Sequence, residues 1–156
     1  YRPNAVAPQA VDLPELLRHV LGLMSKQMEE RNIHIQMDVP FDLPPVNAVN
    51  SQIQQVFLNL ILNAYDAMPA GGNLYINGRT AREGVEILFQ DTGSGVPAEE
   101  TQKIFEPFVS TKEGGTGLGL TVSYNIVTAH GGSLELVPTD DPGACFCLYL
   151  PSGGEK

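Results

Sequence analysis

The sequence predicts an α+β fold, in which one mixed β-sheet carries its helices on a single face. Helical and strand patterns are mixed along the chain, and several strand patterns follow one another as hairpins. The length of 156 residues suits one domain, and 42% apolar against 17% charged residues provide the side chains for a hydrophobic core.

Three long segments and one short segment are predicted to be helices. Asp12 can cap the first, because Pro14 suits a first turn and Glu15 stands three residues after the cap. Its apolar stripe comprises Leu13, Leu16, Leu17, Val20, Leu23, Met24 and Met28. His130 precedes two glycines and is expected to end the last helix. The four helices are expected at residues 12–32, 51–68, 98–104 and 118–130.

Strands are expected where apolar and polar residues alternate between turn signals. They fall at residues 33–37, 46–49, around 74–76, 85–89, 133–137 and 144–150. Residues 1–11 show no periodicity and are predicted to be the remnant of a linker, whereas residues 152–156 form a tail. The domain itself is therefore expected to span residues 12–151.

The charge and the cysteines exclude several classes of function. A net charge of −9 disfavours binding to nucleic acid and to anionic membranes. No apolar run approaches the roughly 20 residues of a membrane span, and no secretory signal opens the sequence, so we expect a cytoplasmic domain without direct membrane contact. Cys145 and Cys147 point to the same face of a strand and lack zinc-site partners, so we interpret them as two small core residues.

The helix at residues 51–68 carries a polar file beside its buried stripe. The file comprises Gln52, Gln55, Asn59, Asn63 and Asp66, at spacings of three and four residues. Asparagine is a mediocre helix former, so the presence of two asparagines one turn apart in this helix calls for an explanation. One interpretation is a hydrated helix flank. The other is that Asn59 and Asn63 present amide oxygens to magnesium, which prefers oxygen ligands and takes the others from waters and phosphates.

A carboxylate ends the strand at residues 85–89. The alternation of that strand places Asp91 on the buried face, where the carboxylate must find a donor. Gly93 and Gly95 would let another molecule approach the backbone, and the amino group of adenine is a suitable donor. The alternative is a turn in which Asp91 caps nearby N–H groups. Gly93, Gly95 and Ala98 also fit the dinucleotide pattern G-x-G-x-x-A, although no βαβ unit surrounds them.

A glycine-rich segment precedes the last long helix. Phe105 and Phe108 would anchor one end of a flexible stretch at residues 109–116, which contains Lys112. Its other end is the glycine-rich run 114–119 at the start of a helix. Because a helix N-terminus offers free N–H groups and partial positive charge, this arrangement suits a lid that closes over phosphates.

Taken together and in order, these stretches resemble the catalytic, ATP-binding domain of sensor histidine kinases. Residues 55–64 resemble the asparagine box, 91–95 the first glycine box, 104–108 the phenylalanine box and 115–120 the second glycine box. The wider superfamily includes gyrase, ATP-dependent heat-shock chaperones and mismatch-repair ATPases. The resemblance implies a two-layer α/β sandwich of the Bergerat type that holds ATP and Mg²⁺ beneath a flexible lid.

The resemblance also implies the roles of individual residues. Asn59 and Lys112 would be catalytic, Asn63 with Asn59 would hold magnesium, and Asp91 would accept from the adenine amino group. The implied nucleotide-binding residues are Asn59, Asn63, Asp66, Asp91, Gly93, Gly95, Val96, Phe108, Thr111, Lys112, Gly115, Thr116, Gly117, Leu118, Gly119 and Leu120.

Asn59 separates the possible activities. ATPases of this superfamily place a glutamate there to activate water, and asparagine cannot act as that base. A histidine kinase needs no such base, because imidazole is already a nucleophile near neutral pH. None of His19, His34 and His130 is followed by an acidic residue, as the acceptor histidine of relatives is.

The resemblance thus implies transfer of the γ-phosphoryl group of Mg-ATP to a histidine on a separate dimerisation domain of the same kinase. A response regulator would be the next partner, and residues 1–11 would follow the dimerisation and phosphoacceptor hairpin. The alternative is a regulatory module that binds ATP without catalysis.

Two positions depart from the pattern of relatives. Many relatives carry a basic residue shortly after the asparagine box, where this chain has Tyr65 and Asp66, so Lys112 would supply more of the phosphate-binding charge. Relatives often have Gly-Thr-Thr-Phe before the last strand, where this chain has Ala144 and Cys145, so a hydroxyl near the adenine is missing.

Overall fold

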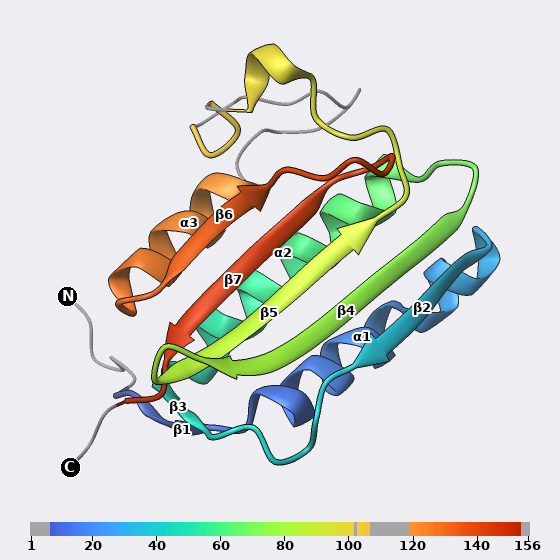
Figure 1. The fold of residues 1–156 in the computed structure, drawn as a ribbon. Coiled ribbons are helices and arrows are strands. Elements are labelled where there is room, and N and C mark those ends of the chain that lie inside the picture. The colour runs from blue at the N-terminus through green and yellow to red at the C-terminus, as the bar shows by residue number, and fades with distance from the viewer. Residues whose placement is uncertain (1–6, 102, 107–118, 154–156) are drawn as a thin grey trace, which may run out of the picture.

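The computed structural model describes residues 7–101, 103–106 and 119–153 (Figure 1). The helices are α1 (Leu13–Glu30), α2 (Asn50–Ala67), α3 (Gly119–Ala129) and a short 3-10 helix, η1 (Ala98–Glu100). The strands are β1 (Gln9–Val11), β2 (Ile33–Asp38), β3 (Val46–Ala48), β4 (Gly72–Ala81), β5 (Gly84–Asp91), β6 (Ser133–Val137) and β7 (Cys145–Pro151).

Five strands form a mixed sheet in the order β2-β4-β5-β7-β6. Strand β2 runs parallel to β4, and every other neighbouring pair in this sheet is antiparallel. Helices α1, α2 and α3 all cover one face of the sheet, so the molecule has two layers (Figure 1). The predicted α+β class and the single helical layer are confirmed.

Helix α1 begins as its sequence predicts. The Asp12 side chain accepts a hydrogen bond from the Glu15 N–H at 3.1 Å, and Pro14 lies in the first turn. The expected stripe is buried except at one position: Leu23 is 54% exposed, whereas Leu21 is buried in the core. The stripe is therefore displaced around the helix toward Leu21, because α1 packs against both the sheet and α2.

Helix α2 begins without a capping side chain of its own. Its N-cap residue is Val49, and the Val49 N–H donates to Nε2 of His130 at 3.1 Å. The other ring nitrogen, Nδ1, lies 2.8 Å from the Ile126 carbonyl oxygen, which can only accept. His130 is therefore neutral in this arrangement, with its proton on Nδ1. It follows α3 as expected, but its ring joins the end of α3 to the start of α2.

A second, two-stranded sheet joins the segment before α1 to the segment before α2. Strand β1 pairs antiparallel with β3, with Val11 opposite Val46, and both side chains are buried. The segment at residues 9–11 was expected to belong to a linker. Three residues are too few to show a period, and the pairing is with a distant segment, so local pattern does not reveal this strand.

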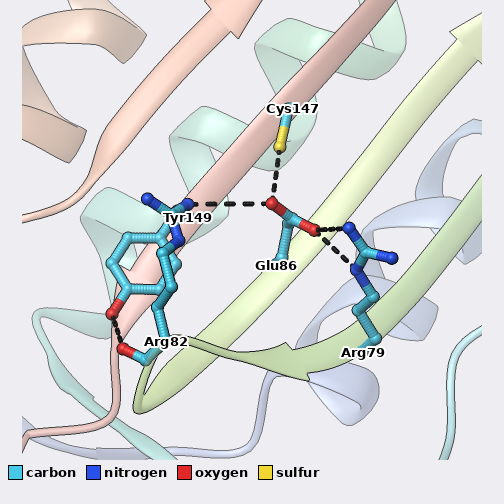
Figure 2. A network of polar contacts seen from close by, with 5 residues as sticks. All are labelled: Arg79, Arg82, Glu86, Cys147 and Tyr149. Carbon is cyan, nitrogen blue, oxygen red and sulfur yellow. Dashed lines mark hydrogen bonds and ion pairs between the residues drawn. The ribbon is translucent and has the colours of Figure 1, made fainter.

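A polar network occupies the face of the main sheet opposite the helices (Figure 2). Glu86 forms an ion pair with Arg79 at 2.6 Å and a longer one with Arg82 at 3.7 Å. The Tyr149 hydroxyl donates to the Arg82 carbonyl at 2.6 Å. Arg82 has a φ of 49°, so this bond helps to hold the β4–β5 turn in the left-handed backbone conformation.

The cysteines differ in their surroundings. Cys145 is buried, but Cys147 is half-buried on the outer face, where its thiol donates to Glu86 at 3.3 Å. The interpretation of both as core residues is therefore wrong for Cys147. Burial, the hydrogen bond to Glu86 and nearby negative charge raise the pKa of the Cys147 thiol to about 12. Burial likewise raises the pKa of Cys145.

The pKa of the Glu86 carboxyl shifts in the opposite direction. Burial raises the pKa of Glu86, but the hydrogen bonds from Cys147 and Arg79 and the charges of Arg79 and Arg82 outweigh it. The pKa therefore lies below its ordinary value of 4.5.

Across the described ranges, no three His, Cys, Asp or Glu side chains gather as a metal site. Nor does any helix described here combine the length and apolarity needed to cross a membrane.

Candidate functional site

Asp91 lies at the end of β5 and is only 2% exposed. Its Oδ1 atom accepts from the Gly93 N–H at 2.8 Å and from the Ala144 N–H at 3.2 Å. The backbone N–H of Asp91 donates to the Ala144 carbonyl at 3.0 Å, which continues the pairing of β5 with the segment before β7. The predicted inward orientation is confirmed, and two backbone amides fix the carboxylate in place.

The glycines after Asp91 permit close packing of backbone segments. A Cβ atom on Gly93 would overlap the Ala67 carbonyl at the end of α2, to which the Ser94 N–H donates at 3.2 Å. Gly95 has a φ of +77°, and a Cβ atom there would lie 3.2 Å from the Gly143 carbonyl oxygen. The absence of a side chain at Gly93 thus has a structural reason within the chain, independent of any ligand.

Asn59 joins α2 to the first turn of α3. Its Nδ2 atom donates to the Gly119 carbonyl and to the Ser123 Oγ, each at 3.1 Å. Its Oδ1 atom accepts from Gln55 Nε2 at 2.9 Å. The amide is half-buried, so it is not simply a hydrated flank of the helix. Asn63 follows one turn later on the same helix and is also half-buried.

Phe105 packs on the other side of the first turn of α3. Its ring stacks on Tyr124 with 5.2 Å between centroids and meets the edge of Phe146 at 6.3 Å. The Thr121 hydroxyl donates to the Phe105 carbonyl at 2.8 Å. The start of α3 is therefore tied both to α2, through Asn59, and to the aromatic segment that precedes residue 107.

The remaining predicted site residues fall into two groups. Asp66 is exposed on α2, Gly119 is exposed at the start of α3, and Val96 and Leu120 are half-buried against the core. Seven predicted residues lie outside the described part of the chain: Phe108, Thr111, Lys112, Gly115, Thr116, Gly117 and Leu118. The expected helix at residues 98–104 is instead the 3-10 helix η1 followed by turns.

Sequence reasoning missed the partner of Asn59. Ser123 is completely buried, with its hydroxyl against the Asn59 amide. Its spacing of four residues from both Gly119 and Val127 places it on the inner face of α3, which is the only sequence signal that points to it. Gln55 was part of the predicted polar file, but its bond to Asn59 was not foreseen.

Tyr65 has a cationic neighbour from another helix. The Arg31 guanidinium lies 3.7 Å above the centre of the Tyr65 ring, and its Nη1 donates to the Tyr65 carbonyl at 3.0 Å. Arg31 follows the end of α1, so this contact fastens α1 to the end of α2. Arg31 therefore has a structural role at Tyr65, one of the two residues that stand where the resemblance predicts a basic residue.

Residues 48–154 match the family described as histidine kinase-, DNA gyrase B- and HSP90-like ATPases. The chain belongs to this family. It is 38% identical over 150 residues to the sensor histidine kinase ZraS of Escherichia coli, an alignment that covers 96% of this chain and 32% of ZraS. The chain thus spans about a third of the length of that relative.

Solved structures place the domain within the family. The catalytic domain of the histidine kinase ThkA superposes with a TM-score of 0.86 at 30% identity, covering 95% of this chain and 99% of that domain. Full-length ShkA in complex with AMPPNP gives 0.84 at 31% identity, covering 96% of this chain and 32% of ShkA. ThkA in complex with the response regulator TrrA gives 0.82 at 28% identity, covering 96% and 43%. The chain is a histidine kinase catalytic domain.

Proposed function

We propose that this domain binds Mg-ATP and transfers the γ-phosphoryl group to a histidine on a separate dimerisation domain, as a step of two-component signalling. The observation that carries the proposal is the arrangement of Asp91, Asn59 and Asn63: a buried carboxylate at the end of β5 and two half-buried amides on α2. The family membership supplies ATP as the nucleotide. The AMPPNP bound to ShkA supports the same choice.

The environment of Asp91 fits an adenine ring. Its carboxylate is held by two backbone N–H groups, so its position is fixed before a ligand arrives. Gly95 and Val96 follow on the adjacent loop, and Ala144 lies against Asp91 across the sheet. In this proposal the carboxylate accepts from the adenine amino group, while Val96 supplies apolar surface for the ring.

The two asparagines fit magnesium by their chemistry. Amide oxygens are hard ligands of the kind that Mg²⁺ prefers, with phosphates and waters completing its shell. Asn63 would hold the cation directly, and Asn59 would lie beside it near the phosphates. When bound, the cation supplies neutralisation of phosphate charge. The chain's own residues position the nucleotide, and Lys112, Gly117 and Gly119 would contact the phosphates.

Asn59 also makes efficient hydrolysis of ATP unexpected. An amide cannot take a proton from water, so Asn59 provides no general base for attack by water. The imidazole of an acceptor histidine attacks without that help. Phosphoryl transfer therefore depends on positioning and charge neutralisation, which this domain provides.

The proposed partners follow from the family. A dimerisation domain of the same kinase provides the acceptor histidine, and a response regulator receives the phosphoryl group afterwards. The ThkA structure contains a response regulator, TrrA, which supports a regulator as partner here. We place the domain in the cytoplasm, where ATP and response regulators are found.

A transfer assay tests this function. The chain is mixed with the histidine-bearing dimerisation domain of its parent kinase and with γ-labelled Mg-ATP. We expect acid-labile phosphohistidine on the dimerisation domain, and its loss with Asn63→Ala. Nucleotide binding without any labelled histidine would instead favour a regulatory module that binds ATP without catalysis.

A further inference from the structure

The amide of Asn59 has one allowed orientation. The carbonyl oxygen of Gly119 can accept a hydrogen bond but cannot donate one, so the atom that faces it at 3.1 Å must be the amide nitrogen. The same nitrogen lies 3.1 Å from the Ser123 hydroxyl oxygen. Both amide hydrogens of Asn59 are thus directed at α3, one to each acceptor.

This orientation determines which atom of Asn59 is presented outward. With Nδ2 directed at α3, Oδ1 is directed away from it and accepts from Gln55 Nε2 at 2.9 Å. An amide oxygen has two lone pairs, so Oδ1 can accept from Gln55 and still face a second donor or a cation. A flipped amide would instead direct its two N–H groups toward the cation and its oxygen toward the Gly119 carbonyl oxygen.

The two acceptors on α3 are unequal. Gly119 is exposed at the first turn, and its carbonyl belongs to a helix terminus. Ser123 lies one turn further in and is fully buried, so its hydroxyl is held by the surrounding core. Ser123 is therefore the more rigid of the two contacts, and Gln55, being exposed, is the most easily displaced.

We propose that Ser123 is a positioning residue: it fixes the Asn59 amide so that Oδ1 faces the magnesium ion at the nucleotide phosphates, and it couples the first turns of α3 to that geometry. This inference rests on the proposed function, because it takes Asn59 to act near the phosphates. Ser123 itself touches neither nucleotide nor acceptor histidine. It acts only through Asn59, and this restriction makes its effect separable from that of the site.

The side-chain amide signals of Asn59 in the ligand-free, ¹⁵N-labelled chain provide the first test. Ser123→Ala removes one acceptor, so we expect the two Asn59 NH₂ signals to shift and their hydrogens to exchange with solvent faster. Ser123→Thr keeps the hydroxyl and should leave the signals near their wild-type positions. If the extra methyl of Ser123→Thr prevents folding, Ser123→Cys, a similar shape with a weak acceptor, should give an intermediate shift. Unchanged Asn59 signals in Ser123→Ala would overturn the inference.

Ser25→Ala is the matched control. Ser25 is also a helical serine, but its hydroxyl donates within α1, to the Gly22 carbonyl at 3.1 Å. We expect this variant to leave the Asn59 signals and the transfer rate unchanged. A shift of the Asn59 signals in both serine variants would show a general effect of the substitution and would contradict a specific role for Ser123.

A double-mutant cycle in the transfer assay provides the second test. Because one hydrogen bond is at stake, Ser123→Ala should lower kcat about three- to tenfold while KM for Mg-ATP stays within about twofold. In an Asn59→Ala background the same change should have almost no further effect, since Ser123 acts through Asn59. An equal loss in both backgrounds would overturn the inference. Failure of the wild-type chain to transfer phosphate would refute the proposed function instead, and the Asn59 signals would still decide whether Ser123 orients the amide.

Discussion

At the scale of single residues, the site depends on side chains whose positions are fixed by backbone groups. The Gly93 and Ala144 amides hold one oxygen of Asp91, and the Gly119 carbonyl fixes the orientation of Asn59. A carboxylate or amide that is already oriented loses little freedom when a ligand binds. Such residues can therefore be tested by substitutions that retain shape and change only one atom.

Asp91→Asn is the mildest such change. Asparagine retains Oδ1 as acceptor for both backbone amides, so the fold should remain intact, whereas the replaced oxygen can no longer accept from adenine. We expect the binding free energy for ATP analogues to weaken by about 1–3 kcal/mol. Calorimetry would measure the affinity and far-UV circular dichroism the fold. Wild-type affinity in a folded variant would remove Asp91 from the site.

The Cys147 thiol should be unreactive. Its pKa of about 12, against an ordinary 9.0, leaves little thiolate at pH 8. Because only the thiolate is alkylated, we expect the folded Cys145→Ser variant to react with iodoacetamide roughly a thousandfold more slowly than after unfolding. Adding Glu86→Gln removes a negative charge and should accelerate the reaction. Equal rates in the folded and unfolded chains would show that the thiol is not protected.

The raised pKa of Cys147 also predicts how the stability of the domain changes at high pH. The folded chain favours the protonated thiol, so the contribution of Cys147 to stability is fully present below pH 9 and is lost as the pH rises toward 12. A Cys147→Ala variant should lack this part of the pH dependence in urea unfolding.

At the scale of secondary-structure elements, the ends of the helices are held by contacts with distant segments of the chain as well as by local residues. Helix α1 has its own cap in Asp12, but α2 takes an acceptor for the Val49 N–H from His130, 81 residues later. The start of α3 is likewise fastened by Asn59 and Phe105. These contacts place α2 and α3 side by side at the site.

His130→Ala should therefore destabilise the domain. It leaves the half-buried Val49 N–H without its imidazole acceptor and disconnects the end of α3 from the start of α2. We expect the free energy of unfolding to fall by about 1–3 kcal/mol in urea titrations. His34→Ala, at an exposed position of β2, is the control and should have no measurable effect. Equal stability of the two variants would contradict this role of His130.

The predictable elements are those with a local signal. Alternation along β5 predicted that Asp91 faces inward, and capping chemistry predicted the start of α1. The strand at Gln9–Val11 had no local signal, because its pairing partner lies some 35 residues away in the register of β1 with β3. Ser123 was missed for the same reason: its importance comes from Asn59, on another helix.

At the scale of the whole molecule, the sheet order brings the parts of the site together. Strand β7 lies between β5 and β6, so the segment before β7 pairs with Asp91 while α3 packs beneath β6 beside α2 (Figure 1). Of the four stretches that resemble kinase boxes, residues 55–64 thus lie on α2 and Asp91 ends β5, whereas the structure describes the other two only in part. The chain is accordingly expected to contain the nucleotide site but no acceptor for the phosphoryl group.

The isolated chain should therefore bind Mg-ATP without labelling itself. His19 and His34 are exposed and lack an acidic successor, and His130 is engaged by both ring nitrogens. Hydrolysis should be slow, since general-base assistance is worth about 10²- to 10⁴-fold and Asn59 cannot supply it. Incubation with γ-labelled ATP would measure both. Acid-labile phosphate on this chain, or brisk steady-state turnover, would contradict the assignment of Asn59 or of the acceptor.

Calorimetric titration of the chain with AMPPNP, with and without Mg²⁺, tests the nucleotide site most directly. We expect one site per chain, tighter binding with Mg²⁺ than without it, and a Mg²⁺ dependence that Asn63→Ala abolishes and Leu23→Ala, at an exposed position of α1, leaves intact. Absence of binding under both conditions, or a Mg²⁺ dependence that survives Asn63→Ala, would contradict the account.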